Sequence, residues 1–140
     1  MDNFTKLMSA WEEVLNKDTE LAERNKSTYS TLEGRTAIQI EVDKLRPYKV
    51  DITDGTFKVQ QGAAQQPLLT WKLSGDLFKE VLLGKYRLIF GILDPRGTLA
   101  FDTPNFTHWN GATIIEMLFL AQEMTMKNPP IAKLVTELEC

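Results

Sequence analysis

The sequence of 140 residues contains one cysteine, one histidine and no excess of positive charge. A single cysteine, Cys140, excludes an intramolecular disulfide and gives no reason to expect an oxidising compartment. With His108 as the only histidine, one chain cannot assemble a zinc site of the His/Cys type. The formal net charge is −3 and the pI is about 5.2, so the chain has no basic field for a phosphate backbone. We therefore expect no metal and no nucleic-acid partner.

The sequence also lacks an apolar run long enough to cross a membrane. Such a helix needs about 20 consecutive apolar residues. The apolar stretch that begins at Ile114 is interrupted by Glu116 and followed by Gln122 and Glu123. The amino-terminal sequence MDNFTKLMSAWEEVLNK has acidic residues and no apolar segment of a signal peptide. These absences predict a cytoplasmic protein with no transmembrane segment.

Motifs for catalysis and phosphate binding are missing as well. No strand-turn-helix elbow presents a serine that would act with His108 and Asp102. The pair Gly84-Lys85 lacks the preceding glycine of a phosphate-binding loop, and a lysine at a helix end is explained by the helix dipole. We predict no catalytic residue, no cofactor and no enzymatic activity.

What the sequence does have is the composition of an ordinary globular protein. Hydrophobic residues make up 43% and charged residues 25% of the chain. A chain of this length buries about 68–70% of the surface that its unfolded form exposes, which is enough for a sizeable core. We expect one domain that spans residues 1–140.

Hydrophobic spacing predicts a helix at the beginning of the chain. Apolar residues recur there at helical spacing at Phe4, Leu7, Met8, Trp11, Val14 and Leu15. Asp2 or Asn3 can cap this helix at its amino terminus. A short second helix is predicted to start at Asp18, and Glu33-Gly34 then indicates a turn.

From Arg35 the apolar period changes from 3.6 to 2, which is typical of strands. The segments RTAIQIEV, YKVDI and TFKVQ each alternate, and Asp54-Gly55 between the last two is a two-residue hairpin signal. They predict an antiparallel meander with one face covered by helices and one polar face. The polar loop QGAAQQP leads to a further strand from Leu69 to Leu73.

The second half of the chain returns to helices. Ser74 is a good cap for the helix GDLFKEVLLGK, which ends at Gly84. The next segment, YRLIFGIL, is followed by a turn at Pro95 and Gly97, which favours a hairpin that ends in a strand from Leu99 to Phe101. The alternative for LIFGIL is a buried helical turn. The stretch WNGATIIEMLFLAQEM then predicts a long helix that is apolar over most of its circumference.

Such a helix must be surrounded, either by the core alone or by the core and a bound apolar ligand. Both interpretations stay open, because apolar side chains serve either purpose. Met117, Met124 and Met126 favour a site that adapts to ligands of variable shape, although methionine also fills gaps in cores. Glu116 and Glu123 lie two turns apart, and Lys127 follows at ion-pair spacing, which indicates a solvated stripe. The alternative is that Glu116 points inward to hold a polar head group.

The order of these elements resembles the sterol carrier protein lipid-transfer domain family. The resemblance covers residues 8–126, and its most specific piece is the strand-to-helix passage LTWKLSGDLFKEVLLGK. Two departures are GILDPRG, where Pro95 interrupts a glycine-flanked strand of the family, and TPNFTHWNG, which looks like an insertion before the last helix.

The resemblance implies an α+β fold. Four to five helices would cover one face of a mostly antiparallel sheet of five strands, or six if YRLIFGIL is also a strand. An apolar tunnel between the sheet and the helices would bind a fatty acid, an acyl-CoA or a sterol without covalent chemistry. The side chains that we expect to line the tunnel are Phe78, Val81, Leu82, Phe90, Phe101, Trp109, Ile114, Met117, Leu118, Ala121 and Met124. Candidates for contact with a charged head group are Lys85, Arg87 and Arg96. The alternative function is a protein-interaction or self-association module with a filled core, and a homodimer stays open.

Overall fold

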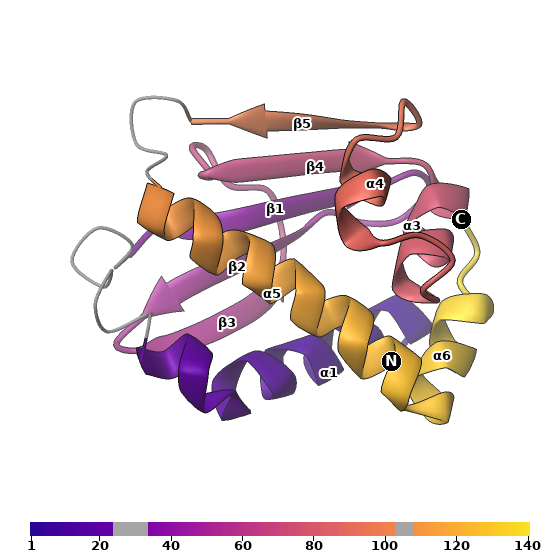
Figure 1. The fold of residues 1–140 in the computed structure, drawn as a ribbon, viewed down its shortest axis with the longest axis horizontal. Coiled ribbons are helices and arrows are strands. Elements are labelled where there is room, and N and C mark those ends of the chain that lie inside the picture. The colour runs from indigo at the N-terminus through magenta and orange to yellow at the C-terminus, as the bar shows by residue number, and fades with distance from the viewer. Residues whose placement is uncertain (24–33, 103–107) are drawn as a thin grey trace.

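The computed structural model describes residues 1–23, 34–102 and 108–140, with the backbone alone at 108–110. In this part of the chain, five strands form one sheet, and the helices pack against one face and one end of that sheet (Figure 1). The strands are β1 (Thr36–Val42), β2 (Tyr48–Thr53), β3 (Thr56–Gln61), β4 (Leu69–Leu73) and β5 (Gly97–Phe101). The helices are α1 (Asn3–Lys17), α3 (Gly75–Leu82), α4 (Leu88–Ile92), α5 (His108–Lys127) and α6 (Pro129–Thr136).

The sheet has the strand order β3-β2-β1-β4-β5. All neighbours are antiparallel except β1 and β4, which pair in parallel with Ile40 opposite Trp71. The meander turns at Asp54 and Gly55, whose φ angles of 50° and 80° are those of a type I′ hairpin. The predicted α+β fold with a mostly antiparallel five-stranded sheet is therefore confirmed.

The two faces of the sheet differ as the alternation predicts. Ile38 and Ile40 of β1 are buried beneath the helices. The opposite face carries polar side chains such as Asp51, which accepts hydrogen bonds from Thr36 Oγ1 (2.5 Å) and Gln60 Nε2 (2.8 Å). This face is not wholly open to solvent, because Gln39 of β1 is buried and its Oε1 accepts a hydrogen bond from the Ala64 amide in the following loop (2.8 Å).

Helix α1 begins as predicted, with Asp2 Oδ1 accepting a hydrogen bond from the Thr5 amide (2.8 Å). Along its length it lies beside β3 and covers the outer edge of the sheet (Figure 1). Asn16 exchanges two hydrogen bonds with the backbone of Phe57, at 2.9 and 2.8 Å, and Glu12 Oε2 accepts one from the Val59 amide at 2.7 Å. These side chains satisfy backbone groups that an open edge would present to another chain.

The predicted second helix starts at Asp18, whose Oδ1 accepts a hydrogen bond from the Leu21 amide (2.7 Å). Residues 19–23 are helical, and the remainder of the predicted segment lies outside the described residues. Gly34 occupies a turn with a φ of 73°, whereas Glu33 also lies outside them. The predicted cap of α3 is confirmed, because Ser74 Oγ accepts a hydrogen bond from the Leu77 amide (3.2 Å).

Two predictions for the second half were wrong or incomplete. The segment LIFGI forms helix α4, so the favoured hairpin and the sixth strand are absent from the described residues, while the strand from Leu99 to Phe101 is present within β5. Helix α6 is not among the predicted elements, and it begins with two consecutive prolines, Pro129 and Pro130. Both prolines lie in the first turn of α6, where an amide hydrogen has no helical acceptor to lose.

The surroundings of helix α5 explain why it is apolar on nearly all sides. It crosses the helical face of the sheet diagonally and has α1, α3, α4 and α6 beside it (Figure 1). Ile114 and Met117 are completely buried, whereas Phe119 remains 47% exposed on the outer side. The predicted ion pair on the solvent side forms between Glu123 and Lys127 (2.5 Å).

Candidate functional site

A closed apolar cavity lies between the sheet and the helices, in the part of the chain that the structure describes. Its volume is about 20 Å³. The lining side chains come from α1, β1, β4, α3, α4 and α5, and they are Leu7, Met8, Trp11, Ile40, Trp71, Phe78, Val81, Leu82, Leu88, Leu118, Ala121 and Met124. A space this small holds no lipid, and the tunnel stays a prediction.

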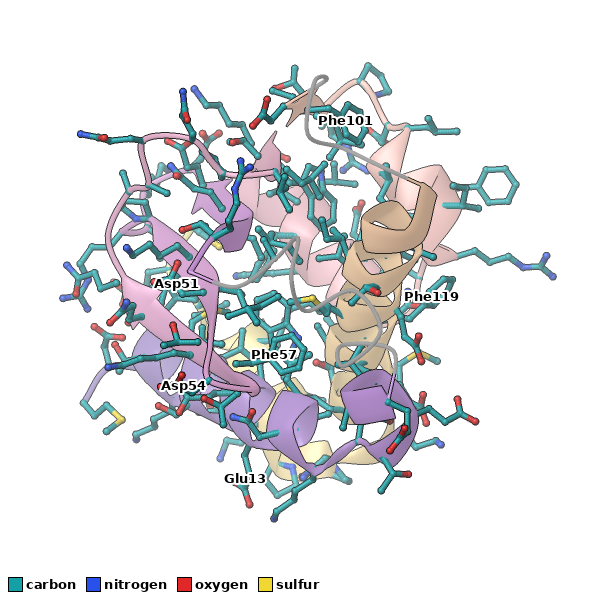
Figure 2. All side chains as sticks on the ribbon, turned by 90° about the vertical axis from the view of Figure 1, so that its left-hand side faces the viewer. Glu13, Asp51, Asp54, Phe57, Phe101 and Phe119 are labelled. Atoms are coloured by element: carbon teal, nitrogen blue, oxygen red, sulfur yellow. The ribbon has the colours of Figure 1, made fainter. Side chains whose placement is uncertain are left out.

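A second apolar space opens to the surface at the edge of the sheet. It is a groove of about 480 Å³ between β4, β5, α4 and the first half of α5. All of its lining side chains are apolar, and they are Leu69, Ile89, Ile92, Leu93, Leu99, Phe101, Ile114 and Ile115. Figure 2 shows Phe101 at the end of β5 near the beginning of α5. The volume falls within the range of about 300–1,000 Å³ that is typical of ligand pockets.

Large apolar side chains on α4 and β5 are exposed at the rim of this groove. Ile89 is 51%, Leu93 72% and Phe101 47% exposed. Single exposed apolar residues are common on protein surfaces, whereas a contiguous group of them marks a contact or ligand site. The rim and the lining together make this edge of the molecule the strongest candidate site.

Helix α4 is held in place by a few specific contacts. Gln122 Nε2 on α5 donates to the carbonyl oxygens of Val81 (2.9 Å) and Tyr86 (2.8 Å), which ties the segment before α4 to α5. Gly91 faces α3 so closely that an added Cβ would lie 2.3 Å from Val81 Cγ2. Because α4 is short and partly exposed, these contacts determine where the outer wall of the groove stands.

An ion-pair cluster fixes the turn between α4 and β5. Arg96 Nη2 lies 2.6 Å from Glu80 Oε2, and Arg96 Nε lies 3.1 Å from Asp94 Oδ1. Hydrogen bonds from the Arg96 side chain and backbone lower the pKa of Asp94, and hydrogen bonds to Asp94 and Glu80 raise the pKa of Arg96. The predicted head-group contact at Arg96 is thus already engaged with two carboxylates, while Lys85 and Arg87 are exposed close to the start of α4.

The other predicted site residues differ in where they lie. The closed cavity contains the side chains of Phe78, Val81, Leu82, Leu118, Ala121 and Met124. The groove contains those of Phe101 and Ile114, whereas Phe90 is exposed and lines neither space. Met117 is fully buried and its carbonyl oxygen accepts a hydrogen bond from Trp11 Nε1 (3.0 Å). The side chain of Trp109 lies outside the described residues.

Sequence reasoning missed several residues that line the groove, namely Leu69, Ile89, Ile92, Leu93, Leu99 and Ile115. The signal for those in α4 was present, because Ile89, Ile92 and Leu93 stand at the i, i+3 and i+4 positions of one helical face. Only the helical interpretation of LIFGIL brings these side chains to one side.

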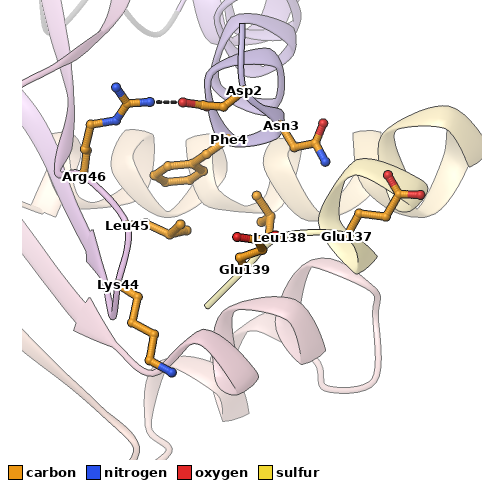
Figure 3. Close-up of a pocket in the computed structure, with 9 residues that line it drawn as sticks. All are labelled: Asp2, Asn3, Phe4, Lys44, Leu45, Arg46, Glu137, Leu138 and Glu139. Atoms are coloured by element: carbon orange, nitrogen blue, oxygen red, sulfur yellow. Dashed lines mark hydrogen bonds and ion pairs between the residues drawn. The ribbon is translucent and has the colours of Figure 1, made fainter.

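A polar hollow of about 510 Å³ lies elsewhere, between the start of α1, residues 44–46 and residues 137–139 (Figure 3). Asp2 and Arg46 form an ion pair across one side of it. Phe4 and Leu138 contribute apolar surface, and Lys44 and Glu137 contribute opposite charges. Because its charges are mixed, this hollow is less suited to an apolar molecule than the groove.

The described residues offer neither a metal site nor a membrane-spanning helix. They contain no group of three or more His, Cys, Asp or Glu side chains arranged for a metal ion. Among the helices that they form, none combines the length and apolarity needed to cross a membrane.

Comparison with protein-family models and with curated proteins finds no similar sequence. Solved structures, in contrast, share the fold. The chain matches the sterol carrier protein domain 2 of Helicoverpa armigera with a TM-score of 0.61 and 16% identity, over 87% of this chain and 90% of that one. It matches sterol carrier protein 2 from Yarrowia lipolytica, solved in its apo form, with a TM-score of 0.55 and 17% identity. That match covers 87% of this chain and 95% of that one.

A third similar structure is a UbiJ-SCP2 protein described as a ubiquinone synthesis protein. It has a TM-score of 0.56 and 14% identity, and the match covers 85% of this chain and 90% of that one. The resemblance seen in LTWKLSGDLFKEVLLGK is therefore confirmed at the level of the fold: the chain has the architecture of sterol carrier protein 2 domains.

Proposed function

We propose that this chain is a non-enzymatic carrier that binds a lipid or another apolar ligand in the groove between β5, α4 and α5. The observation that carries the proposal is the groove itself, with about 480 Å³ of space and a wholly apolar lining. Burial of apolar surface stabilises a complex by about 25 cal/mol per Å², and such a lining has no polar group to orient a hydrophilic substrate. The likeness to sterol carrier protein 2 domains supports the same function.

The closed cavity extends this site into the interior. The groove is lined by Ile89 and Ile92 of α4 and by Ile114 of α5, and the cavity is lined by Leu88 and Leu118 of the same two helices. A small displacement of α4 away from α5 would join the two spaces. We infer that a long apolar chain enters at the groove and occupies the widened interior, with α4 as the movable wall.

An anionic head group would stay outside the groove, because no charged side chain lines it. Lys85 and Arg87 are exposed near the start of α4, while Arg96 is occupied by Asp94 and Glu80. A fatty acid or acyl-CoA would therefore leave its charge in solvent beside Lys85 and Arg87, because burial of an unpaired charge is costly. This assignment retains two of the three predicted head-group contacts.

Native mass spectrometry of the purified protein, followed by lipid extraction, tests the proposal directly. A panel of acyl chains, acyl-CoA and sterols should also raise the melting temperature, since a ligand at 100 times its Kd stabilises the folded state by about 2.7 kcal/mol. Absence of both a co-purified lipid and any thermal shift would overturn the carrier function.

A pair of variants locates the site. Leu93→Asp places a charge at the rim of the groove on a side chain that is 72% exposed, so the fold should persist while the thermal shift is lost. Phe119→Asp is the matched control, because Phe119 is also an exposed apolar residue but lines neither the groove nor the cavity. Equal loss of the shift in both variants would argue against the groove as the binding site.

A further inference from the structure

Two tryptophans line the closed cavity, and their indole N–H groups differ in their partners. Trp11 is 1% exposed, and its Nε1 donates a hydrogen bond to the carbonyl oxygen of Met117 (3.0 Å). Trp71 is 2% exposed, and its Nε1 has no hydrogen-bond acceptor among the residues that the structure describes. Buried tryptophan N–H groups usually have an acceptor, and a buried donor without one destabilises the fold. The Trp71 donor therefore requires an explanation.

An ordered water does not provide one. The cavity of about 20 Å³ has room for a single water, but a buried water needs two to four polar partners. Besides the two indole N–H groups, the side chains that line the cavity offer only the thioether sulfurs of Met8 and Met124, which are weak acceptors. A water molecule beside Trp71 would lose more hydrogen bonds than it forms.

Trp71 lines the closed cavity and neighbours a residue that lines the open groove. Trp71 stands on β4 opposite Leu99 of β5, and Leu99 lines the groove. The Nε1 atom lies on the β5 side, since a carbon added at Gly97 would come within 3.3 Å of it. Leu69, two residues earlier on the same face of β4, also lines the groove. A ligand that reaches from the groove into the cavity would therefore come into contact with Trp71.

We propose that Trp71 donates this N–H to a neutral carbonyl oxygen of the bound ligand, so that the preferred ligand is an apolar ketone, ester or quinone. This inference rests on the proposed carrier function and names the ligand chemistry that the site selects.

The lining of the two spaces decides among the oxygen-bearing groups. Neither space is lined by a cationic side chain, so an ionised carboxylate at Trp71 would be buried without compensation. An alcohol would accept the bond but would bring its own hydroxyl donor, for which the lining has only thioether sulfurs. A carbonyl group accepts without donating, and it satisfies Trp71 without creating a second unpaired group.

The test compares ligands with one chain length and different polar groups. Methyl laurate, tridecane, dodecanol and laurate are titrated into the full chain, and binding is followed by calorimetry. We expect methyl laurate to bind about fivefold to tenfold more tightly than tridecane, which corresponds to one additional hydrogen bond. The Trp71 indole N–H resonance should move downfield with methyl laurate and stay in place with tridecane.

Two variants assign the preference to one indole. Trp71→Phe should abolish the preference for methyl laurate over tridecane and leave the melting temperature of the ligand-free protein unchanged or higher. Trp11→Phe is the matched control for the loss of an indole from the same cavity. It should lower the melting temperature, because the bond to Met117 is lost, while the ratio of the two affinities stays as in the wild type.

The outcomes separate this inference from the carrier function. If methyl laurate and tridecane bind equally well and the Trp71 resonance does not move, Trp71 is not a ligand contact, although the carrier function stands. If neither compound binds, both proposals fail. Since the resonance is measured on the wild type, the test remains decisive even if Trp71→Phe does not fold.

Discussion

The substitution Trp11→Ala tests whether α1 is an integral part of the fold. The Trp11 ring is 1% exposed, lines the closed cavity and donates its N–H to the Met117 carbonyl oxygen. It therefore connects α1 to α5 both by packing and by a buried hydrogen bond. Its removal enlarges the cavity, because neighbouring side chains relax only in part.

The expected cost follows from burial and from the hydrogen bond. Truncation of a buried tryptophan to alanine costs about 3–5 kcal/mol, and a net hydrogen bond contributes about 1 kcal/mol, so the upper half of that range applies to Trp11. For a chain of this size each kcal/mol lowers the melting temperature by roughly 3–4 °C, which gives a decrease of roughly 12–20 °C. Since domains are stable by only about 5–15 kcal/mol, the variant would be close to unfolding at 37 °C.

Urea unfolding followed by circular dichroism measures this cost without relying on tryptophan emission. Trp11→Phe should lose about 1–2 kcal/mol, because the ring is largely kept while the hydrogen bond is lost. Glu13→Ala, on the solvent side of α1, should stay within about 0.5 kcal/mol of the wild type. If the free energy of unfolding of Trp11→Ala also lies within about 1 kcal/mol of the wild-type value, α1 is not packed against α5 as described.

Three shorter predictions concern the region around α4 and Cys140. Gly91→Ala should lower the free energy of unfolding in urea by about 1–3 kcal/mol, because its Cβ would lie 2.3 Å from Val81 Cγ2. The double variant with Val81→Ala should lose less stability than the sum of the two single variants. Hydrogen bonds from Arg96 lower the pKa of Asp94, so the wild type should be more stable than Asp94→Asn above about pH 3.8. This difference in stability should disappear as the pH falls through the pKa of Asp94 in the folded state. A difference in melting temperature that stays constant from about pH 7 to about pH 2 would contradict this. Burial raises the pKa of the Cys140 thiol, so iodoacetamide at pH 8 should alkylate the folded protein more slowly than the urea-unfolded chain, and equal rates would refute it.

Local signals predicted the sheet and its flanking helices well. Asp54-Gly55 supplies the positive φ angles of the hairpin, and Ser74 supplies the acceptor for the Leu77 amide at the start of α3. Both signals act within four residues, so no knowledge of the tertiary structure is needed. The alternation in β1 likewise identified the strand face that the helices cover, because burial on one face imposes a period of two.

Helix α4 was misassigned because its stability comes from distant parts of the chain. Its helical spacing is limited to one set of residues, Ile89, Ile92 and Leu93, and its N-cap residue Arg87 makes no side-chain capping hydrogen bond. The helix is fixed instead by contact of Gly91 with Val81 and by the bond from Gln122 to the Tyr86 carbonyl oxygen. Neither contact is visible in the local sequence, whereas the turn residues Pro95 and Gly97 suit a hairpin and a helix-to-strand turn alike.

Whether an apolar side chain belongs to the core or to the candidate site depends on the volume of the space beside it. A hydrophobic pattern in the sequence carries no information on that volume. Leu118 and Ile114 lie on one helix with the same burial, yet Leu118 lines a closed cavity of about 20 Å³ and Ile114 lines a groove of about 480 Å³. The difference arises from the positions of α4 and β5 relative to α5, which depend on the tertiary contacts described above. Position along α5 relative to α4, more than residue type, therefore determines which apolar side chains are available to a ligand. It follows that changes that move α4, such as Gly91→Ala, should alter ligand binding even though Gly91 lines neither space.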